Sequence, residues 1–322
     1  APIMTDITLP ITNMRFDVTM PLFEGRVAIE GATLEPVQTT PMVFADVPDL
    51  RTGDFGIWDL NMGYLLPAIE AGWEFAALPV FQKRKPVLQF IYVADGINSP
   101  RDLEGARIGT RQYRTSVTIW ARGILAEHFG VDISGIKWAA GIDEFFPNLD
   151  SAGGIEKIDA SASLPDMLIN GEIDAMISDI SDGALFDRLE AEPKVKRLFA
   201  DYREQDLAMG TKTGFLPAMH LMVISAKLDR DHPGLALRAY QAFEEAKALS
   251  YEDIRNDRGG LPIVHMREAF DAQMAAWGDP LVGGIAANRA MIETFIRYNV
   301  EQGSIAAPIP LERIFAASVL ET

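Results

Sequence analysis

Short apolar runs alternate with segments of helical periodicity from one end of the chain to the other, and this order permits few architectures. Runs such as residues 56–60 and 175–178 are short and rich in apolar residues. Between them Leu65, Leu66 and Ile69 recur at the spacing of one helix face. Strands that alternate with helices favour an α/β fold with a mostly parallel, doubly wound sheet.

The predicted elements cover most of the chain. Predicted strands are residues 15–20, 32–38, 56–60, 75–81, 88–94, 105–109, 136–139, 175–178, 195–199 and 219–224. Predicted helices are residues 62–71, 115–129, 164–170, 233–250, 266–277, 285–302 and 311–317. Residues 115–129 are the clearest helix, because Thr115 or Ser116 can cap its start and Gly130 can end it.

The elements fall into two blocks, which predicts two lobes. A compact turn at Ser99-Pro100 opens a new block, and the apolar run 219–224 returns to the first. We therefore expect residues 1–96 to form the first part of lobe 1. Residues 97–213 would form an inserted lobe 2, and residues 214–322 the second part of lobe 1 with the C-terminal helices. The chain would cross near 94–98 and 213–219. Ligands of such folds bind beyond the strands' carboxyl ends, which places the site in a cleft between the lobes.

Charge and composition exclude several functions. With 29 Lys and Arg against 46 Asp and Glu, the net charge of −17 argues against nucleic acid or an anionic membrane as partner. An acidic ligand would need a local group of cations. The absence of cysteine excludes disulfides, thiolate nucleophiles and Cys-ligated metals. No stretch approaches the ~20 apolar residues of a membrane span.

The first residues of the sequence bear on the cellular compartment in which the protein is expected. They contain neither a basic segment nor an apolar core of a signal peptide, and Met4 is a plausible natural start. We therefore expect a cytoplasmic protein. The alternative, a periplasmic protein whose residue Ala1 follows a signal cleavage site, stays open.

Two local patterns resemble the type II solute-binding superfamily, the turn and strand at 99–109 and the helix end and strand at 168–177. A longer resemblance, to the 4,5-dihydroxyphthalate decarboxylase family, extends over some 300 positions in order. Its matches are Phe16-Asp17, 22–27, Glu30-Gly31, 79–81, Arg84, 91–93, Tyr113, 120–123, 138–141, Thr213-Gly214, Pro217, Met219-His220, Asn288-Arg289, Gln302-Gly303, and Leu311-Glu312 with Phe315.

The resemblance implies a two-lobed type II periplasmic-binding-protein-like fold that carries a decarboxylase of hydroxylated aromatic carboxylates, an activity of aromatic compound catabolism. Two departures from the family pattern weaken the expectation of a dicarboxylate. Val87-Leu88 stand where an Arg-His pair is expected, and Asp179-Ile180 stand where Pro-Arg is expected. The alternative function is a solute-binding protein that delivers a small organic anion to a transporter.

His220 and Asp179 are the candidate catalytic residues. His220 lies in a matched segment where the second crossing enters the cleft, and histidine suits proton transfer near neutral pH. The alternative is a structural histidine at a hinge. Asp179 follows a lobe 2 strand and could bind a ring hydroxyl, act as a base, or only cap the next helix.

The candidate ligand-binding residues lie at strand ends and helix starts. The segment 111–116 joins a strand to a helix N-terminus and offers forked donors, hydroxyls and an aromatic ring. Asn61 follows a lobe 1 strand, with Asp59 as its capping neighbour, and Arg84 lies in a basic turn. The complete set is Asn61, Arg84, Arg111, Tyr113, Arg114, Thr115 and Ser116.

The expected ligand is a small anionic aromatic molecule, and we expect no cofactor. The four histidines are scattered, which disfavours a His-rich metal site, although a divalent ion stays open. A homodimer contact through the C-terminal helices also stays open.

Overall fold

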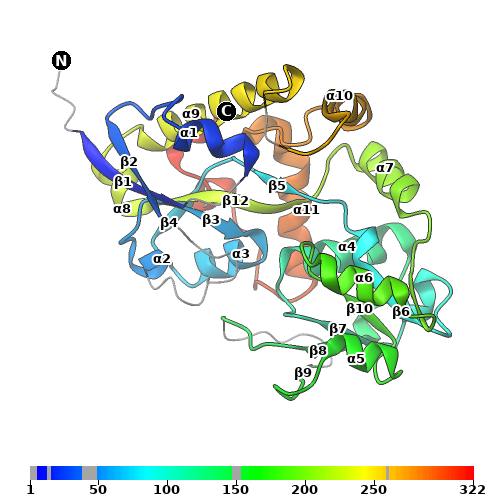
Figure 1. The fold of residues 1–322 in the computed structure, drawn as a ribbon. Coiled ribbons are helices and arrows are strands. Elements are labelled where there is room, and N and C mark those ends of the chain that lie inside the picture. Colours follow the sequence, from blue (N-terminus) through cyan, green and yellow to red (C-terminus); the bar gives the residue numbers. More distant parts are fainter. Residues whose placement is uncertain (1–5, 13–15, 38–48, 147–153, 259–260) are drawn as a thin grey trace.

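The computed structural model describes residues 6–12, 16–37, 49–146, 154–258 and 261–322, and it contains two β-sheets with helices around them (Figure 1). The sheet of β1 to β4 and β12 lies at the upper left of the figure. The sheet of β6 to β10 lies at the lower right, with α4 and α11 between the two regions. The predicted α/β architecture with two lobes is confirmed.

The first sheet has the strand order β2-β1-β3-β12-β4, and β5 also pairs with β12. β1 runs parallel to β2 and β3, whereas β12 runs antiparallel to β3, β4 and β5. The strands are β1 (Ile7–Thr12), β2 (Ala32–Val37), β3 (Ile57–Asn61), β4 (Phe75–Ala77), β5 (Lys83–Arg84) and β12 (Ala218–Ser225). β12 is the predicted return strand, and its whole length is nearly buried.

The second sheet has the order β11-β6-β10-β7-β8-β9. β10, β7, β8 and β9 run parallel to one another, and β6 is antiparallel to both β10 and β11. The strands are β6 (Ile91–Ala94), β7 (Arg107–Thr110), β8 (Lys137–Ala140), β9 (Ile155–Lys157), β10 (Ala175–Ile177) and β11 (Val195–Arg197).

Helices cover both sheets. They are α1 (Met20–Phe23), α2 (Asp49–Thr52), α3 (Met62–Glu70), α4 (Ser116–Phe129), α5 (Leu164–Ile169), α6 (Gly183–Ala191), α7 (Tyr202–Thr213), α8 (Ala226–Asp231), α9 (Leu235–Arg255), α10 (Met266–Trp277), α11 (Ile285–Glu301) and α12 (Leu311–Ile314). Among the described residues there are also five short 3-10 turns, which include η1 (Asp17–Thr19) and η3 (Leu88–Phe90). None of the described helices is long and apolar enough to cross a membrane.

Local sequence explains where the helices near the site begin and end. Asn61 caps α3 by accepting a hydrogen bond from the Gly63 N–H at 2.8 Å. α4 ends at Gly130, whose φ of 66° lies in the left-handed region that favours glycine. Trp120 of this helix is fully buried, and its Nε1 donates to the Ala218 carbonyl at 2.9 Å.

Three predictions about elements are wrong. Residues 16–20 form η1 and the start of α1 rather than a strand, and Arg15 lies outside the described residues. The first strand is β1, which was not predicted because Pro10 interrupts its apolar run. The first half of the predicted strand 88–94 is the 3-10 turn η3. α6 and α7 were also missed.

The predicted boundary between the first two segments needs one correction. β6 was placed in lobe 1 because it precedes residue 97, but it pairs with β10 and β11 in the second sheet. The first crossing therefore comes before β6, in the segment that includes Pro86, Val87 and Leu88. The rest of the division into 1–96, 97–213 and 214–322 stays a prediction.

Candidate functional site

A buried carboxylate holds His220 on the first sheet. His220 lies opposite Asn61 in the pairing of β12 with β3, and Asp59 lies two residues earlier on β3. Side chains two residues apart point to the same face of a strand, so Asp59 reaches the imidazole. Asp59 Oδ2 lies 2.7 Å from His220 Nδ1, and Asp59 Oδ1 accepts a hydrogen bond from Gln82 Nε2.

This pairing leaves one side of the imidazole for a ligand. The Asp59 side chain is only 2% exposed, whereas that of His220 is 12% exposed. In the part of the chain that the structure describes, no group bonds Nε2, the nitrogen on the opposite side of the His220 ring. A carboxylate that fixes Nδ1 both orients the ring and stabilises its protonated form. The arrangement suits a general acid or base.

Lys83 lies next to this pair and reaches the second sheet. It is opposite His220 in the short pairing of β5 with β12. Its Nζ donates to the Ser181 Oγ, 3.1 Å away in the segment after β10. Burial lowers the pKa of Lys83, while Asp59 and Asp179 oppose this change, so the ammonium group lies near both carboxylates. Lys83 thus connects the His220 region to lobe 2.

Arg111 and Asp179 form the lobe 2 side of the same region. They follow β7 and β10, whose residues Thr110 and Ile177 are directly paired. Arg111 Nη1 lies 3.8 Å from Asp179 Oδ2, and both side chains are partly exposed. Burial raises the pKa of Asp179, and the nearby Arg111 opposes the rise. We call the set Asp59, Lys83, Arg111, Asp179, Ser181 and His220 the inter-sheet site.

Tyr64 borders the inter-sheet site on α3. Its hydroxyl donates to Gln112 Oε1 at 2.5 Å, which links α3 to the segment before α4. Burial raises the pKa of Tyr64, and Arg111 acts in the opposite direction. The phenol therefore stays protonated at neutral pH and lies within electrostatic reach of Arg111.

The predicted binding segment before α4 is used largely for packing. Arg114 is 2% exposed, and its two terminal nitrogens donate to the carbonyls of Phe146 at 3.1 Å and Ser304 at 3.0 Å. The Tyr113 hydroxyl donates to the Gln302 carbonyl at 3.2 Å. The Tyr113 N–H donates to the carboxylate of Glu144 at 2.8 Å. Most donors expected to face a ligand already have protein partners.

Thr115, Ser116 and Asn61 join this packing. The Thr115 Oγ1 lies 2.7 Å from the Thr118 Oγ1 inside the first turn of α4. The Ser116 N–H donates to the same Asn61 oxygen that caps α3, at 3.1 Å. The starts of α3 and α4 approach so closely that a Cβ on Gly63 would lie 1.7 Å from the Arg114 carbonyl oxygen. Asn61 therefore connects α3 and α4 through these two bonds, and its ligand role stays a prediction.

Arg84 points away from the inter-sheet site. Successive residues of a strand face opposite sides, so Lys83 faces Ser181 while Arg84 faces α11. Its guanidinium donates to the Val282 carbonyl at 2.7 Å and to Asn288 Oδ1 at 2.6 Å, and burial lowers its pKa to about 10. Of the basic turn, Lys83 rather than Arg84 lies in the site. Arg122 of α4 is also used in packing, because its Nε donates to Gln302 Oε1 at 2.7 Å.

The structure thus brings His220, Arg111 and Asp179 together and adds residues that sequence reasoning missed. Asp59 was named only as a capping neighbour, and Lys83 and Ser181 were not chosen. The period of two along β3 could have paired Asp59 with His220. No sequence signal identifies β5, which has only two residues.

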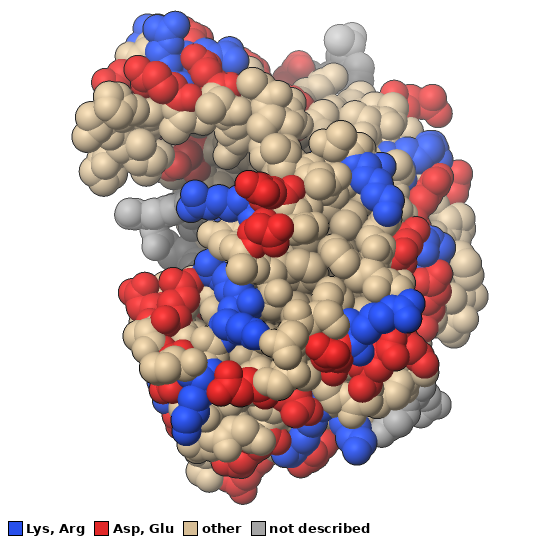
Figure 2. Space-filling view, turned by 90° about the vertical axis from the view of Figure 1, so that its right-hand side faces the viewer, with Lys and Arg blue, Asp and Glu red and all other residues tan. Residues whose placement is uncertain are grey.

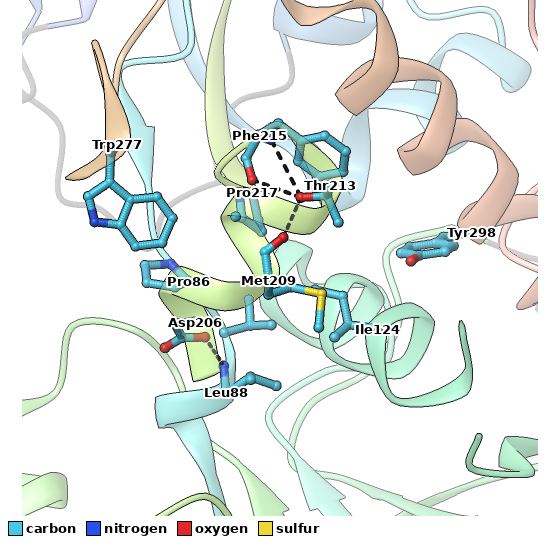
Figure 3. Close-up of a pocket in the computed structure, with 12 residues that line it drawn as sticks. Pro86, Leu88, Ile124, Asp206, Met209, Thr213, Phe215, Pro217, Trp277 and Tyr298 are labelled. Carbon is cyan, nitrogen blue, oxygen red and sulfur yellow. Dashed lines mark hydrogen bonds between the residues drawn. The ribbon is translucent and has the colours of Figure 1, made fainter. Parts of the chain in front are cut away.

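A separate cavity lies where the chain passes between the lobes (Figure 3). It is lined by both crossing segments, including Leu88 and Phe215, and by side chains of α4, α7, α10 and α11. Asp206 of α7 is 5% exposed, and its Oδ1 accepts a hydrogen bond from the Leu88 N–H at 3.2 Å. Burial raises the pKa of Asp206 to about 7. The inter-sheet residues do not line this cavity.

The surface charge and the arrangement of potential metal ligands do not point to a further binding site. Acidic and basic side chains are interspersed over the face drawn in Figure 2, without a broad basic area. In the described ranges, no group of three or more His, Cys, Asp or Glu side chains is placed to hold a metal ion.

Comparison with curated proteins finds relatives of one kind. No family model matches the chain. A 4,5-dihydroxyphthalate decarboxylase of Comamonas testosteroni is 28% identical over 335 aligned positions, which cover 99% of each chain. A 4,5-dihydroxyphthalate decarboxylase of Pseudomonas putida is also 28% identical, over 62% of this chain and 80% of that protein.

Comparison with solved structures shows the fold. The periplasmic aliphatic sulphonate binding protein of Escherichia coli superimposes with a TM-score of 0.58 at 13% identity, covering 98% of this chain and 99% of that one. A putative periplasmic sulfonate-binding protein of Methylobacillus flagellatus gives a TM-score of 0.57 at 12% identity, covering 97% and 92%. The chain therefore resembles the 4,5-dihydroxyphthalate decarboxylases in sequence along almost its whole length, on the two-lobed fold of the periplasmic solute-binding proteins.

Proposed function

We propose that this protein is a non-oxidative decarboxylase whose substrate, a small hydroxylated aromatic carboxylate, binds at the inter-sheet site beside His220. The observation that carries the proposal is the Asp59–His220 pair, with its 2.7 Å hydrogen bond and a ring nitrogen left for a ligand. The similarity to decarboxylases over nearly the full chain supports the reaction class. The whole molecule carries a net charge of −17. Within it, the cations Lys83 and Arg111 provide a local site where an anion can bind.

The chemistry requires one proton and no oxidant. His220, protonated, gives the proton on Nε2 to the ring carbon that carries the carboxylate, and a new C–H bond forms. The bond between that carbon and the carboxylate then breaks. Its electron pair returns to the ring, and carbon dioxide leaves. Asp59 stabilises the imidazolium before the transfer.

Ring hydroxyls support this step because they donate electron density to the carbon that is protonated. A hydroxyl hydrogen can be accepted by the Asp179 carboxylate, whose raised pKa makes it a stronger proton acceptor than an ordinary aspartate. Arg111 lies beside Asp179 and can stabilise the phenolate oxygen that develops. These roles keep His220 and Asp179 as the proposed catalytic residues.

The test measures carbon dioxide release from a panel of hydroxylated benzoates and phthalates. His220→Asn should slow release by about 10²–10⁴-fold, because an amide cannot transfer the proton. His265→Asn is the matched control, since His265 is exposed at the start of α10. A wild-type protein that binds these compounds without releasing carbon dioxide, or an active His220→Asn variant, would contradict the proposal.

Solute binding is the second candidate, because the similar solved structures include sulphonate-binding proteins. In that case His220 would bind the ligand or act at a hinge. Tight binding without turnover identifies this function. The two proposals also differ in location, because the decarboxylase would act in the cytoplasm and the transport protein in the periplasm. Fractionation of the source cells separates them.

A further inference from the structure

The cationic side chains near the inter-sheet site differ in how fully their charges are already used. Arg84 and Arg114 donate to carbonyl oxygens of buried backbone. Arg111 has an acidic partner in Asp179. Lys83 has only the neutral hydroxyl of Ser181 as its hydrogen-bond partner among the described residues. Of these four cations, Lys83 is the one whose charge is most available to a ligand.

The surroundings of Lys83 also limit how much negative charge the site can accept. Its ammonium group is partly buried and lies within electrostatic reach of the carboxylates of Asp59 and Asp179. Counting Lys83, Arg111 and the protonated His220 of the proposed mechanism against Asp59 and Asp179, the formal charge of the inter-sheet site is one positive unit. A ligand with one carboxylate neutralises this charge. A second carboxylate on the neighbouring ring carbon would add a negative charge that no residue of the inter-sheet site balances, next to the carboxylates of Asp59 and Asp179.

We propose that Lys83 and Ser181 bind the substrate carboxylate and that the substrate is a hydroxylated aromatic monocarboxylate rather than a phthalate. This inference rests on the proposed function, which identifies the ligand as a substrate. Lys83 is paired with His220 in the register of β5 and β12, so their side chains leave the same face of the sheet, and a carboxylate bound to Lys83 brings its ring carbon toward the imidazole. The Ser181 hydroxyl, 3.1 Å from Nζ, supplies a second donor from lobe 2.

Binding is measured by titration calorimetry with 3,4-dihydroxybenzoate and with 4,5-dihydroxyphthalate. The monocarboxylate should bind at least about tenfold more tightly. Lys83→Met should weaken its binding by about tenfold to a hundredfold, the range for a lost hydrogen bond to a charged group. Ser181→Ala should give a smaller loss, and because Ser181 is exposed this variant keeps the fold.

Lys85→Met is the matched control. It removes the same charge from the same basic turn at an exposed position, so it should leave the affinity unchanged within about twofold. Thermal unfolding of each variant checks that the fold is intact. Equal or tighter binding of the phthalate, or equal affinities of Lys83→Met and Lys85→Met, would overturn the proposal.

The outcomes separate this inference from the proposed function, because affinity is measured without turnover. If the monocarboxylate binds through Lys83 and no carbon dioxide is released, the decarboxylase proposal fails and the assignment of Lys83 stands. If carbon dioxide is released and Lys83→Met binds normally, Lys83 is not the carboxylate-binding residue.

Discussion

The start of α4 and the inter-sheet site contain similar side chains but differ in how these side chains are bonded. Both combine cations with hydroxyls next to the ends of strands. At the start of α4, Arg114 is 2% exposed and donates to two backbone carbonyls. In the inter-sheet site, Arg111 and Lys83 remain partly exposed, with one polar partner each.

The difference shows how burial decides between packing and binding. A buried guanidinium must have hydrogen-bond acceptors, because an unpaired buried charge costs far more than a hydrogen bond contributes. Where the starts of α3 and α4 meet, backbone carbonyls supply those acceptors and leave few donors for a ligand. Lys83 and Arg111 instead keep some contact with solvent, so their donors remain available to a ligand.

The largest effect is expected for Arg114→Ala, which tests whether the start of α4 serves packing rather than ligand binding. Two hydrogen bonds from a charged group, each contributing about 1.5–3 kcal/mol, should be lost, so the free energy of unfolding should fall by about 3 kcal/mol or more. Chemical denaturation measures this change. The same substitution at Arg111, whose side chain is 29% exposed and paired at 3.8 Å, should lower stability by less than about 1 kcal/mol but weaken ligand binding.

The opposite result would reverse the assignment of the two regions. If Arg114→Ala folds with nearly normal stability and loses ligand affinity, the start of α4 is the anion-binding region. The sequence-based prediction for Arg114 would then hold against the contacts seen in the structure.

The variant Asp59→Asn tests whether the Asp59–His220 pair of the inter-sheet site is catalytic or structural. The amide keeps the shape of the carboxylate but cannot stabilise an imidazolium, so carbon dioxide release should fall by about 10²-fold. The monocarboxylate should still bind, because Asp59 is 2% exposed and bonds His220 and Gln82 rather than the ligand. A variant with normal turnover would show that the pair is structural. His265→Asn again serves as the unaffected control.

Asn61→Ala tests the connection between the two regions. The Asn61 oxygen accepts hydrogen bonds from the N–H groups of Gly63 and Ser116, so one change removes a helix cap and a contact between α3 and α4. The free energy of unfolding should fall by about 2 kcal/mol. Asn61→Asp, which keeps the acceptor, should retain most of the stability. Equal losses in both variants would count against the role of this oxygen.

Asp206, which lies in neither region, should give a pH dependence of stability rather than a change in binding or turnover. Its pKa rises from 3.8 to about 7 in the fold, so the folded chain holds the proton more tightly than the unfolded chain. The resulting stabilisation is complete below about pH 4 and is lost as the pH rises through about 7, by at most about 1.4 kcal/mol per pH unit. Asp206→Asn removes this dependence.

Unfolding measured between pH 5 and 8 compares the two proteins. The stability of the wild type relative to Asp206→Asn should decrease over that range. Parallel curves would mean that Asp206 titrates normally and that the cavity at the crossings is well hydrated.

The sequence predicted the architecture better than the site. Alternating apolar runs and helical periods identified most strands and helices, because those patterns follow directly from which side of an element is buried. His220 and Asp179 were proposed from their places on or after strands, and their catalytic roles stay predictions. Arg84 was chosen over Lys83 because it matches a position of the family pattern, and a strand of two residues shows no period that would indicate which side chain faces the site. The contacts of Arg114 with Phe146 and Ser304 join distant parts of the chain, so no local pattern could indicate them.

The most direct test of this account is the crystal structure of the protein with 3,4-dihydroxybenzoate bound. The carboxylate should lie within hydrogen-bonding distance of the Lys83 Nζ and the Ser181 Oγ, with the ring next to the His220 Nε2. Glu144 should keep its 2.8 Å hydrogen bond from the Tyr113 N–H. A carboxylate bound instead at the Tyr113 N–H, in place of Glu144 and away from Lys83, would contradict the assignment of the inter-sheet site.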